Sequence, residues 1–288
     1  MLMSIGCLSL SDFDRGWLVG FIEAEGSFTR KSDNYRPFFS LGQNDRDVLK
    51  EIQRLLGFGA VSKSWKKNKE SKAWRYTVYA KSGLEVIIRF LNGRLKTELK
   101  KSQFRHWIDL FNSNIRKREF DYTFCGGDYV ISTSQFDVGW LVGFVEGEGS
   151  FTYNKGDGWP VFAITHNDKR ILEEVRRFFG FGQVIRHCGR IDCRAWRFQV
   201  QHNPFALDKL KLFFDGKLKS PSRQMQFNFW AGLFDPSHPI RVNGREHERL
   251  RSQEYYSRNP EKRKESVRRS RMKRRVLRVE EVEASEGY

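Results

Sequence analysis

Four glutamates stand in register in two nearly identical stretches of the chain. Residues 16–28 read GWLVGFIEAEGSF and residues 139–151 read GWLVGFVEGEGSF. The acids are Glu23, Glu25, Glu146 and Glu148. Each lies near the C-terminal end of an expected helix, where the helix dipole disfavours negative charge. If the two helices pack in parallel, Glu25 and Glu148 arrive side by side, and neighbouring carboxylates repel unless they are protonated or bridged by cations. Carboxylate oxygens of this kind suit Mg2+.

Small residues recur at every fourth position of each stretch and would leave a ridge without side chains along each helix. They are Gly16, Gly20 and Ala24 in the first stretch and Gly139, Gly143 and Gly147 in the second. Such ridges let helix backbones approach more closely than the usual distance of roughly 8 to 10 Å. Glycine inside a helix otherwise costs about 1 kcal/mol relative to alanine. We therefore predict that the two halves of the chain meet along these helices, about a pseudo-twofold axis.

The similarity continues beyond these stretches at a shift of 123 positions, the separation between Gly16 and Gly139. It covers residues 11–112 and 134–235, which we expect to be two equivalent subdomains. In each unit the pattern predicts a helix, two strands, an amphipathic helix, two more strands and two closing helical segments. This order indicates an α+β fold, αββαββα in each half, with helices that cover one face of a four-stranded sheet.

Alternation along the strands separates two faces in each sheet. In the first half the predicted buried face holds Phe28, Phe39, Leu41, Trp74, Tyr76 and Val78. The opposite face holds Ser27, Thr29, Lys31, Ser40, Arg75 and Thr77 in the first half and Ser150, Thr152, Asn154, Thr165, Arg197, Gln199 and Gln201 in the second. These polar and basic faces are either ordinary solvated surfaces or surfaces that contact a ligand.

The charge of the chain favours a polyanionic partner. With 52 Lys+Arg against 35 Asp+Glu, the formal net charge is +17, an excess typical of nucleic-acid binding. The longest apolar runs are too short to cross a bilayer, so we expect a soluble protein without a membrane partner. The four cysteines show no paired metal-ligand spacing and are expected to be reduced thiols.

Two segments lie outside the repeat. Residues 113–133 are expected to be a linker between the units. Residues 236–288 are dense in Arg and Lys, poor in large apolar residues, and end in an acidic run. We expect this segment to be a basic, flexible tail without a packed core. Non-specific phosphate binding is the functional alternative for its basic part.

The motifs LVGFIEAEG at residues 18–26 and LVGFVEGEG at residues 141–149 resemble the two defining motifs of the LAGLIDADG homing endonucleases, in the single-chain form with two motifs. The resemblance covers residues 11–235. It departs from the commonest spelling of the motif by having Glu for Asp, which preserves the carboxylate. It implies two pseudo-symmetric subdomains, each with a four-stranded antiparallel sheet, packed through the two motif helices, with the open sheet faces forming a saddle over DNA.

The resemblance also implies roles for individual residues. Glu25 and Glu148, with the carbonyls of Ala24 and Gly147, would bind divalent metal, whereas Glu23 and Glu146 would be structural. A basic residue at the start of the last helix is expected at Lys100, with Lys101 as its rival, and at Arg223 in the second half. Gln43 and His166 align where members of the family often order the active-site water; for His166 alone, an ordinary surface or hydrogen-bonded histidine is the alternative.

Taken together, the resemblance implies an enzyme that depends on Mg2+ or Mn2+ and makes a double-strand break in a long, asymmetric DNA target. Two sheets end to end would span about 50 Å, or about 15 base pairs. One alternative is an intron maturase that binds its host intron RNA on the same scaffold. Another is a sequence-specific DNA-binding protein that does not cleave. We expect a monomer in whichever compartment holds the target DNA, an organelle matrix or the cytoplasm of a prokaryote.

Overall fold

The computed structural model describes residues 10–32, 35–66, 69–114, 121–187 and 195–258, together with 260–262, 264, 268 and 272. The first half of the repeat contains α2 (Asp12–Glu25), β1 (Gly26–Arg30), β2 (Pro37–Gln43), α3 (Arg46–Leu56), β3 (Ala60–Lys66), β4 (Lys69–Val78), α4 (Lys81–Leu91) and α5 (Glu98–Asn114). The second half contains α6 (Gln135–Glu148), β5 (Gly149–Tyr153), β6 (Pro160–His166), α7 (Lys169–Phe179), β7 (Gln183–Arg186), β8 (Trp196–Gln201), α8 (Pro204–Phe214) and α9 (Pro221–Gly232). The α+β fold with two αββαββα halves is confirmed.

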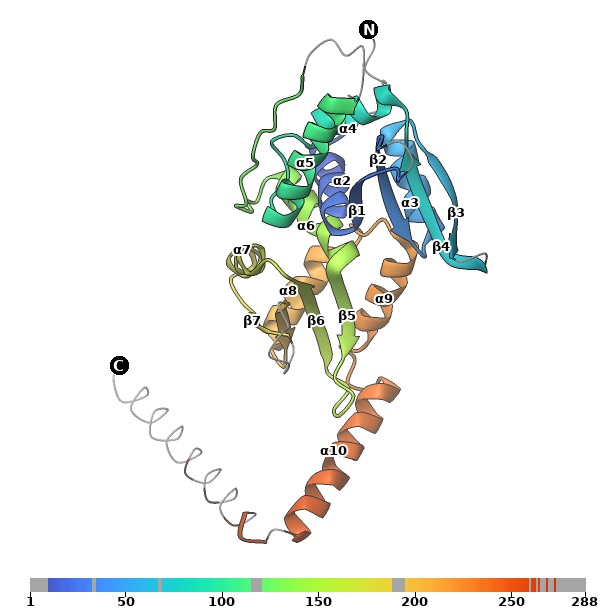
Figure 1. Cartoon of the computed structure of the whole chain (residues 1–288). Coiled ribbons are helices and arrows are strands. Elements are labelled where there is room, and N and C mark those ends of the chain that lie inside the picture. The colour runs from blue at the N-terminus through green and yellow to red at the C-terminus, as the bar shows by residue number, and fades with distance from the viewer. Residues whose placement is uncertain are drawn as a thin grey trace, which may run out of the picture. The chain divides into compact units, whose positions relative to one another are not determined.

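Each half has one four-stranded antiparallel sheet, with strand orders β1-β2-β4-β3 and β5-β6-β8-β7 (Figure 1). The register pairs Ser27 with Ser40 and Ser40 with Thr77, so these residues share a face, as predicted. The opposite face carries the buried Phe39 and Tyr76. Helices α3 and α5 pack on the first sheet, and α7, α8 and α9 pack on the second.

Both motif helices begin with a serine N-cap. Ser11 accepts a hydrogen bond from the backbone N–H of Asp14, and Ser134 accepts one from the N–H of Asp137. Such caps satisfy one of the backbone donors that a helix start leaves without an intrahelical partner. The motif helices are therefore fixed at the end opposite to their glutamates.

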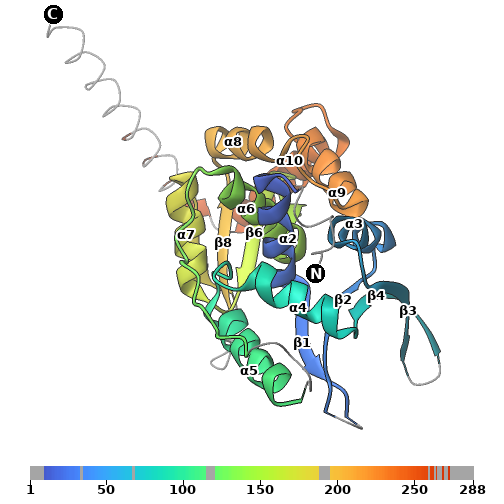
Figure 2. The same ribbon diagram turned by 90° about the horizontal axis from the view of Figure 1, so that it is seen from above.

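The two motif helices, α2 and α6, lie side by side and parallel between the two sheets (Figure 2). A Cβ atom added to Gly20 would lie 2.0 Å from the carbonyl oxygen of Trp140, and one added to Gly143 would lie 2.0 Å from that of Trp17. Gly16 and Gly139 face backbone atoms of the partner helix just as closely. The two helices therefore pack along their glycine ridges about a pseudo-twofold axis, as predicted.

The described chain divides into two compact units. The first unit spans residues 1–153 and 160–232 and so contains both halves of the repeat, and the second combines residues 154–159 with residues 233–288. Within the part of the chain that the structure describes, no helix is long and apolar enough to span a membrane.

The second unit corrects the expectation of a flexible tail from residue 236, because helix α10 (Pro239–Arg258) occupies much of it. Its first turns pack on the turn of residues 154–159, where the Arg241 guanidinium lies 3.9 Å from the ring centroid of Trp159. A Cβ added to Gly244 would lie 2.6 Å from the carbonyl carbon of Asp157, so a glycine is needed at this contact. The high charge of the segment concealed this small packing surface from prediction.

Candidate functional site

The carboxylates of Glu25 and Glu148 lie together where α2 and α6 end. Their proximity shows in the contact between the helix ends, since a Cβ added to Gly147 would lie 2.2 Å from the Cβ of Ala24 and 3.2 Å from the Cγ of Glu25. Burial, followed by the negative charge of Glu25, raises the pKa of Glu148 to about 7. Burial also raises the pKa of Glu25, opposed by a hydrogen bond with Gln43 and by the charges of Arg223 and Lys100.

Two basic side chains reach the same helix ends from the starts of α5 and α9. Lys100 donates from Nζ to the carbonyl oxygen of Gly26 at 2.7 Å. Arg223 donates from Nε to the carbonyl oxygen of Glu146 at 2.6 Å and from a terminal nitrogen to that of Gly147 at 3.1 Å. Burial lowers the pKa of Lys100 and of Arg223, although nearby glutamates oppose the shift in both. The rival Lys101 instead pairs with Glu98 at 3.2 Å.

A cavity of about 210 Å³ joins side chains from both halves of the chain. Lys100 from the first half lines it together with Glu148, Thr165 and His166 from the second. His166 accepts a hydrogen bond at Nδ1 from the backbone N–H of Asp168 at 3.0 Å, and burial lowers the pKa of its ring. The ring is therefore neutral with its proton on Nε2.

The carboxylate pair fits Mg2+ by the chemistry of its donors. The two half-buried carboxylates have raised pKa values, and a bound cation would relieve the repulsion between their negative charges. Among the residues that the structure describes, no group of three or more His, Cys, Asp or Glu side chains is arranged to hold a metal. A site with two carboxylates, completed by water and substrate oxygens, is the kind of site that Mg2+ uses.

The raised pKa of Glu148 predicts how stability without metal depends on pH. The unfolded carboxyl has a pKa near 4.5 and the folded one about 7, so the stability that the protonated form contributes is present below pH 4.5 and is lost as pH rises to 7. Because the carboxyl is half-buried and partly screened by solvent, we expect the loss to be roughly 1 to 2 kcal/mol. In EDTA, Glu148→Gln should therefore raise the melting temperature at pH 8 more than at pH 5. An equal effect at both pH values in thermal unfolding would contradict this expectation.

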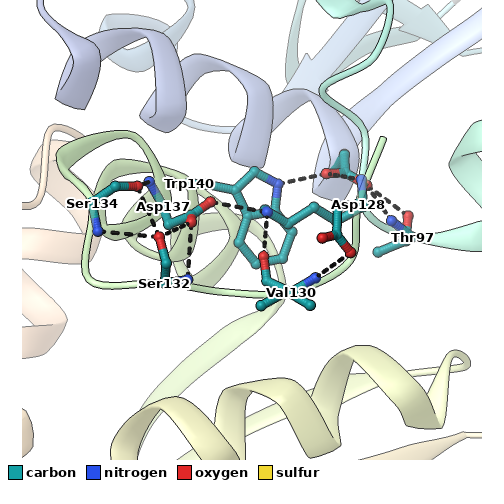
Figure 3. A network of polar contacts seen from close by, with 9 residues as sticks. Thr97, Asp128, Val130, Ser132, Ser134, Asp137 and Trp140 are labelled. Carbon is teal, nitrogen blue, oxygen red and sulfur yellow. Dashed lines mark hydrogen bonds and ion pairs between the residues drawn. The ribbon is translucent and has the colours of Figure 1, made fainter. Parts of the chain in front are cut away.

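The second acid of the first motif is held by a buried network (Figure 3). The carboxylate of Glu23, 1% exposed, accepts from the backbone N–H groups of Lys96 and Thr97 and from the Oγ of Thr97. It also accepts from Nε1 of Trp140, in the other half of the chain, at 2.5 Å. Lys96 continues the network, because its Nζ lies 2.9 Å from a carboxylate oxygen of Asp137.

The same network occurs a second time with the halves exchanged. Glu146 accepts from the backbone N–H groups of Lys219 and Ser220 and from Nε1 of Trp17 at 2.8 Å. The Nζ of Lys219 lies 2.7 Å from a carboxylate oxygen of Asp14. Each network thus ties the motif helix of one half to the motif helix of the other.

Two further aspartates connect the halves by capping two helices each. Asp45 caps α3 through the N–H of Asp47, and its second oxygen accepts from the N–H of Ser222 in α9 at 3.0 Å. Asp168 caps α7, and its second oxygen accepts from the N–H of Glu98 at the start of α5 at 3.1 Å. The helices that carry Lys100 and Arg223 are therefore anchored by residues of the opposite half.

The residues proposed to face a ligand follow the predicted side of the two sheets. Twelve of them are exposed or half-buried: Ser27, Thr29, Lys31, Arg75, Thr77, Ser150, Thr152, Asn154, Thr165, Arg197, Gln199 and Gln201. Lys31 and Asn154 lie just past the ends of β1 and β5. Ser40 is an exception, at 5% exposed, because it sits on the central strand between Ser27 and Thr77. On the other face Phe28 and Trp74, predicted to be buried, are half-buried.

A family model described as LAGLIDADG endonuclease matches residues 18–111 and, a second time, residues 141–234. The chain belongs to the LAGLIDADG endonuclease family. The predicted membership and its form with two motifs in one chain are confirmed. Both matches of the family model include a motif helix with its glutamates and the last helix with its basic residue.

Curated proteins similar to this chain include "Probable intron-encoded endonuclease 4" of Neurospora crassa, 31% identical over 47% of this chain and 24% of that protein. "Intron-encoded DNA endonuclease ai2a" of Dictyostelium discoideum is 25% identical over 55% of this chain and 46% of that protein. The chain therefore spans less than half the length of these relatives.

Solved structures share the fold of this chain at low sequence identity. I-AabMI bound to uncleaved DNA matches with a TM-score of 0.58 and 18% identity, over 82% of this chain and 97% of that chain. I-GzeII in complex with its DNA target matches with a TM-score of 0.56 and 21% identity, over 83% and 96%.

The residues that link the halves were not predicted from the sequence. Trp17 and Trp140, Asp14 and Asp137, and Lys96 and Lys219 are pairs of identical residues at the shift of 123. That identity was a usable signal for a shared structural role. It did not say that each residue would bond to the half in which it does not lie.

Proposed function

We propose that this protein is a site-specific homing endonuclease that makes a metal-dependent double-strand break in a long, asymmetric DNA target. The observation that carries the proposal is the pair of Glu25 and Glu148 at the ends of two parallel helices, with the pKa of Glu148 raised to about 7 partly by Glu25. Membership of the endonuclease family supports it. Each carboxylate would serve the cutting of one strand.

Glu25 and Glu148 would hold Mg2+ or Mn2+, together with the carbonyl of Ala24. The carbonyl of Gly147 already accepts a hydrogen bond from Arg223, so it has one remaining lone pair for this purpose. When bound, divalent metal would activate water and stabilise the attacking and leaving oxygens of the scissile phosphate.

The neighbouring side chains have complementary roles in this proposal. Lys100 and Arg223 are cations fixed at the helix ends, where they would bind and orient the scissile phosphates. His166, protonated on Nε2, can donate a hydrogen bond toward the cavity that it lines with Lys100 and Glu148. Gln43, hydrogen-bonded with Glu25, would occupy the equivalent position in the first half. Both would order water for in-line attack.

DNA recognition would use the open faces of the sheets. Arg75, Arg197, Gln199 and Gln201 carry the hydrogen-bonding groups suited to base edges in the major groove. The halves differ at paired positions, because Gln199 in the second sheet occupies the place of Thr77 in the first. Different contacts on the two sides favour an asymmetric site. Because the two halves already meet within one chain, we propose that the protein acts as a monomer.

The curated relatives suggest the genetic setting, since two of them are named as intron-encoded endonucleases. We propose that this protein is encoded in an intron too and acts in the compartment that holds its target DNA. A maturase bound to its host intron RNA would not require the paired carboxylates of Glu25 and Glu148. Their arrangement therefore favours the nuclease over the maturase.

Selection of a DNA target in solution tests the proposal. The full chain would be incubated with a library of duplexes that carry a long randomised segment, in Mg2+ or in EDTA, and cut ends would be sequenced. We expect one long, asymmetric consensus cut on both strands in Mg2+ and no cutting in EDTA. Tight binding of a selected duplex without cutting in Mg2+ or Mn2+ would instead support a non-cleaving regulator. Accelerated splicing of a host intron without DNA cutting would support a maturase.

A further inference from the structure

The cations proposed for the active site are placed by residues that belong to the opposite half of the chain. Lys100 lies in the first turn of α5, and three contacts fix the segment that enters this turn. Glu23 binds the backbone N–H groups of Lys96 and Thr97. Asp137 holds the side chain of Lys96, and Asp168 caps the N–H of Glu98. Asp137 and Asp168 come from the second half.

Trp140 links this anchor to the second motif helix (Figure 3). Its Nε1 donates to the same carboxylate of Glu23 that holds Lys96 and Thr97. Both Trp140 and Glu23 are buried. A buried carboxylate that loses a donor is left with an unmet hydrogen bond, so it shifts toward its remaining donors. This shift would move the backbone of Lys96 and Thr97, four and three positions before Lys100.

Arg223 is anchored by the equivalent contacts, with the two halves of the chain exchanged. Glu146 binds the N–H groups of Lys219 and Ser220 and accepts from Trp17, while Asp14 pairs with the side chain of Lys219. The two networks share no residue. Each one leads to a single basic side chain, and each depends on the motif helix of the opposite half.

We infer that Trp140 and Asp137 are positioning residues for Lys100, that Trp17 and Asp14 are positioning residues for Arg223, and that each network governs the cutting of a different DNA strand. This inference rests on the proposed nuclease function. A cation displaced by about 1 Å from a reacting phosphate loses much of its effect. At metal sites, loss of the outer partners that orient the ligands commonly costs about 10- to 100-fold in affinity or activity, and we expect an effect of similar size here.

Strand-resolved, single-turnover cleavage tests the inference. The full chain in Mg2+ would cut a duplex of its selected target that carries a different label on each strand. Lys100→Met first identifies the strand that depends on Lys100. We expect Trp140→Phe and the nearly isosteric Asp137→Asn to slow cutting of that strand about 10- to 100-fold, with the other strand within about threefold. Trp17→Phe and Asp14→Asn should show the opposite strand preference.

A general loss of stability would not give this pattern. Leu210→Ala provides the control, because Leu210 is buried in α8 and belongs to neither network. It should lower the melting temperature and leave the ratio of the two strand rates unchanged. If Trp140→Phe and Asp137→Asn slow both strands equally, or slow the strand that Lys100→Met spares, the inference is overturned. Absence of cutting by the unchanged chain would refute the nuclease function itself, which is a separate result.

Discussion

Replacing Glu25 or Glu148 by glutamine is expected to abolish double-strand cleavage in Mg2+ while leaving DNA binding nearly unchanged. Glutamine keeps the size of the side chain but removes the negative charge that a divalent cation needs. The sheet faces proposed to bind DNA are not altered. Because a metal contributes several kcal/mol to the stabilisation of a phosphoryl transition state, we expect cutting to fall by about a thousandfold or more.

The measurement is a single-turnover cleavage rate alongside a binding titration with the same duplex. Glu85→Gln is a matched control, since Glu85 lies on α4 and pairs with Lys81 at 3.5 Å, away from the motif helices. It should cut at the rate of the unchanged protein. Full cleavage by both Glu25→Gln and Glu148→Gln would remove the basis of the proposed function.

Replacing Gly20 or Gly143 by alanine is expected to destabilise the protein strongly, although it adds only one methyl group to a motif helix. The new Cβ of either variant would lie 2.0 Å from a carbonyl oxygen of the partner helix, a backbone atom that cannot move without separating α2 from α6. Alanine favours a helix over glycine by about 1 kcal/mol, so the measured loss in the free energy of unfolding would be smaller than the cost of the clash itself. We expect the free energy of unfolding to fall by about 3 kcal/mol or more.

Urea unfolding of each variant measures this effect. Gly42→Ala is the control, because a Cβ added at Gly42 has no atom within 4 Å and the residue lies in β2. That variant should unfold close to the midpoint of the unchanged protein. If Gly20→Ala were as stable as Gly42→Ala, the close packing of the two helices would be wrong.

Local pattern and internal repetition were enough to predict the elements of each half. The N-cap serines, the strand alternation and the glycine ridge all act within a few residues or between two copies of one motif. They led to the parallel pairing of α2 and α6 and to the meeting of Glu25 with Glu148. The internal repeat supported these predictions because each predicted element had to fit both copies of the sequence.

Contacts between segments far apart in the chain could not be predicted from local patterns or from the repeat. Trp140 and Glu23 are 117 positions apart, and no local pattern states that an indole will donate to that carboxylate. For the same reason the sequence could not show that Lys100 lines a cavity with Glu148 and His166 of the second half. Ser40 lies on the predicted face but is covered by its neighbours, which strand alternation alone cannot express.

The exchanged contacts have a consequence for how the chain can be divided. The tryptophan, aspartate and lysine of each network have identical counterparts in the other half, as Trp17 has in Trp140, Asp14 in Asp137 and Lys96 in Lys219. Two copies of the first half would thus offer each other these contacts, with Trp17 of one copy donating to Glu23 of the other and Asp14 of one copy pairing with Lys96 of the other. The interface between the motif helices is thus isologous, as in twofold homodimers, because the same surface of each half contacts the other. Such a symmetric assembly would carry two lysines at its centre in place of one lysine and one arginine. Because its two sheets would be identical, it would suit a palindromic DNA target.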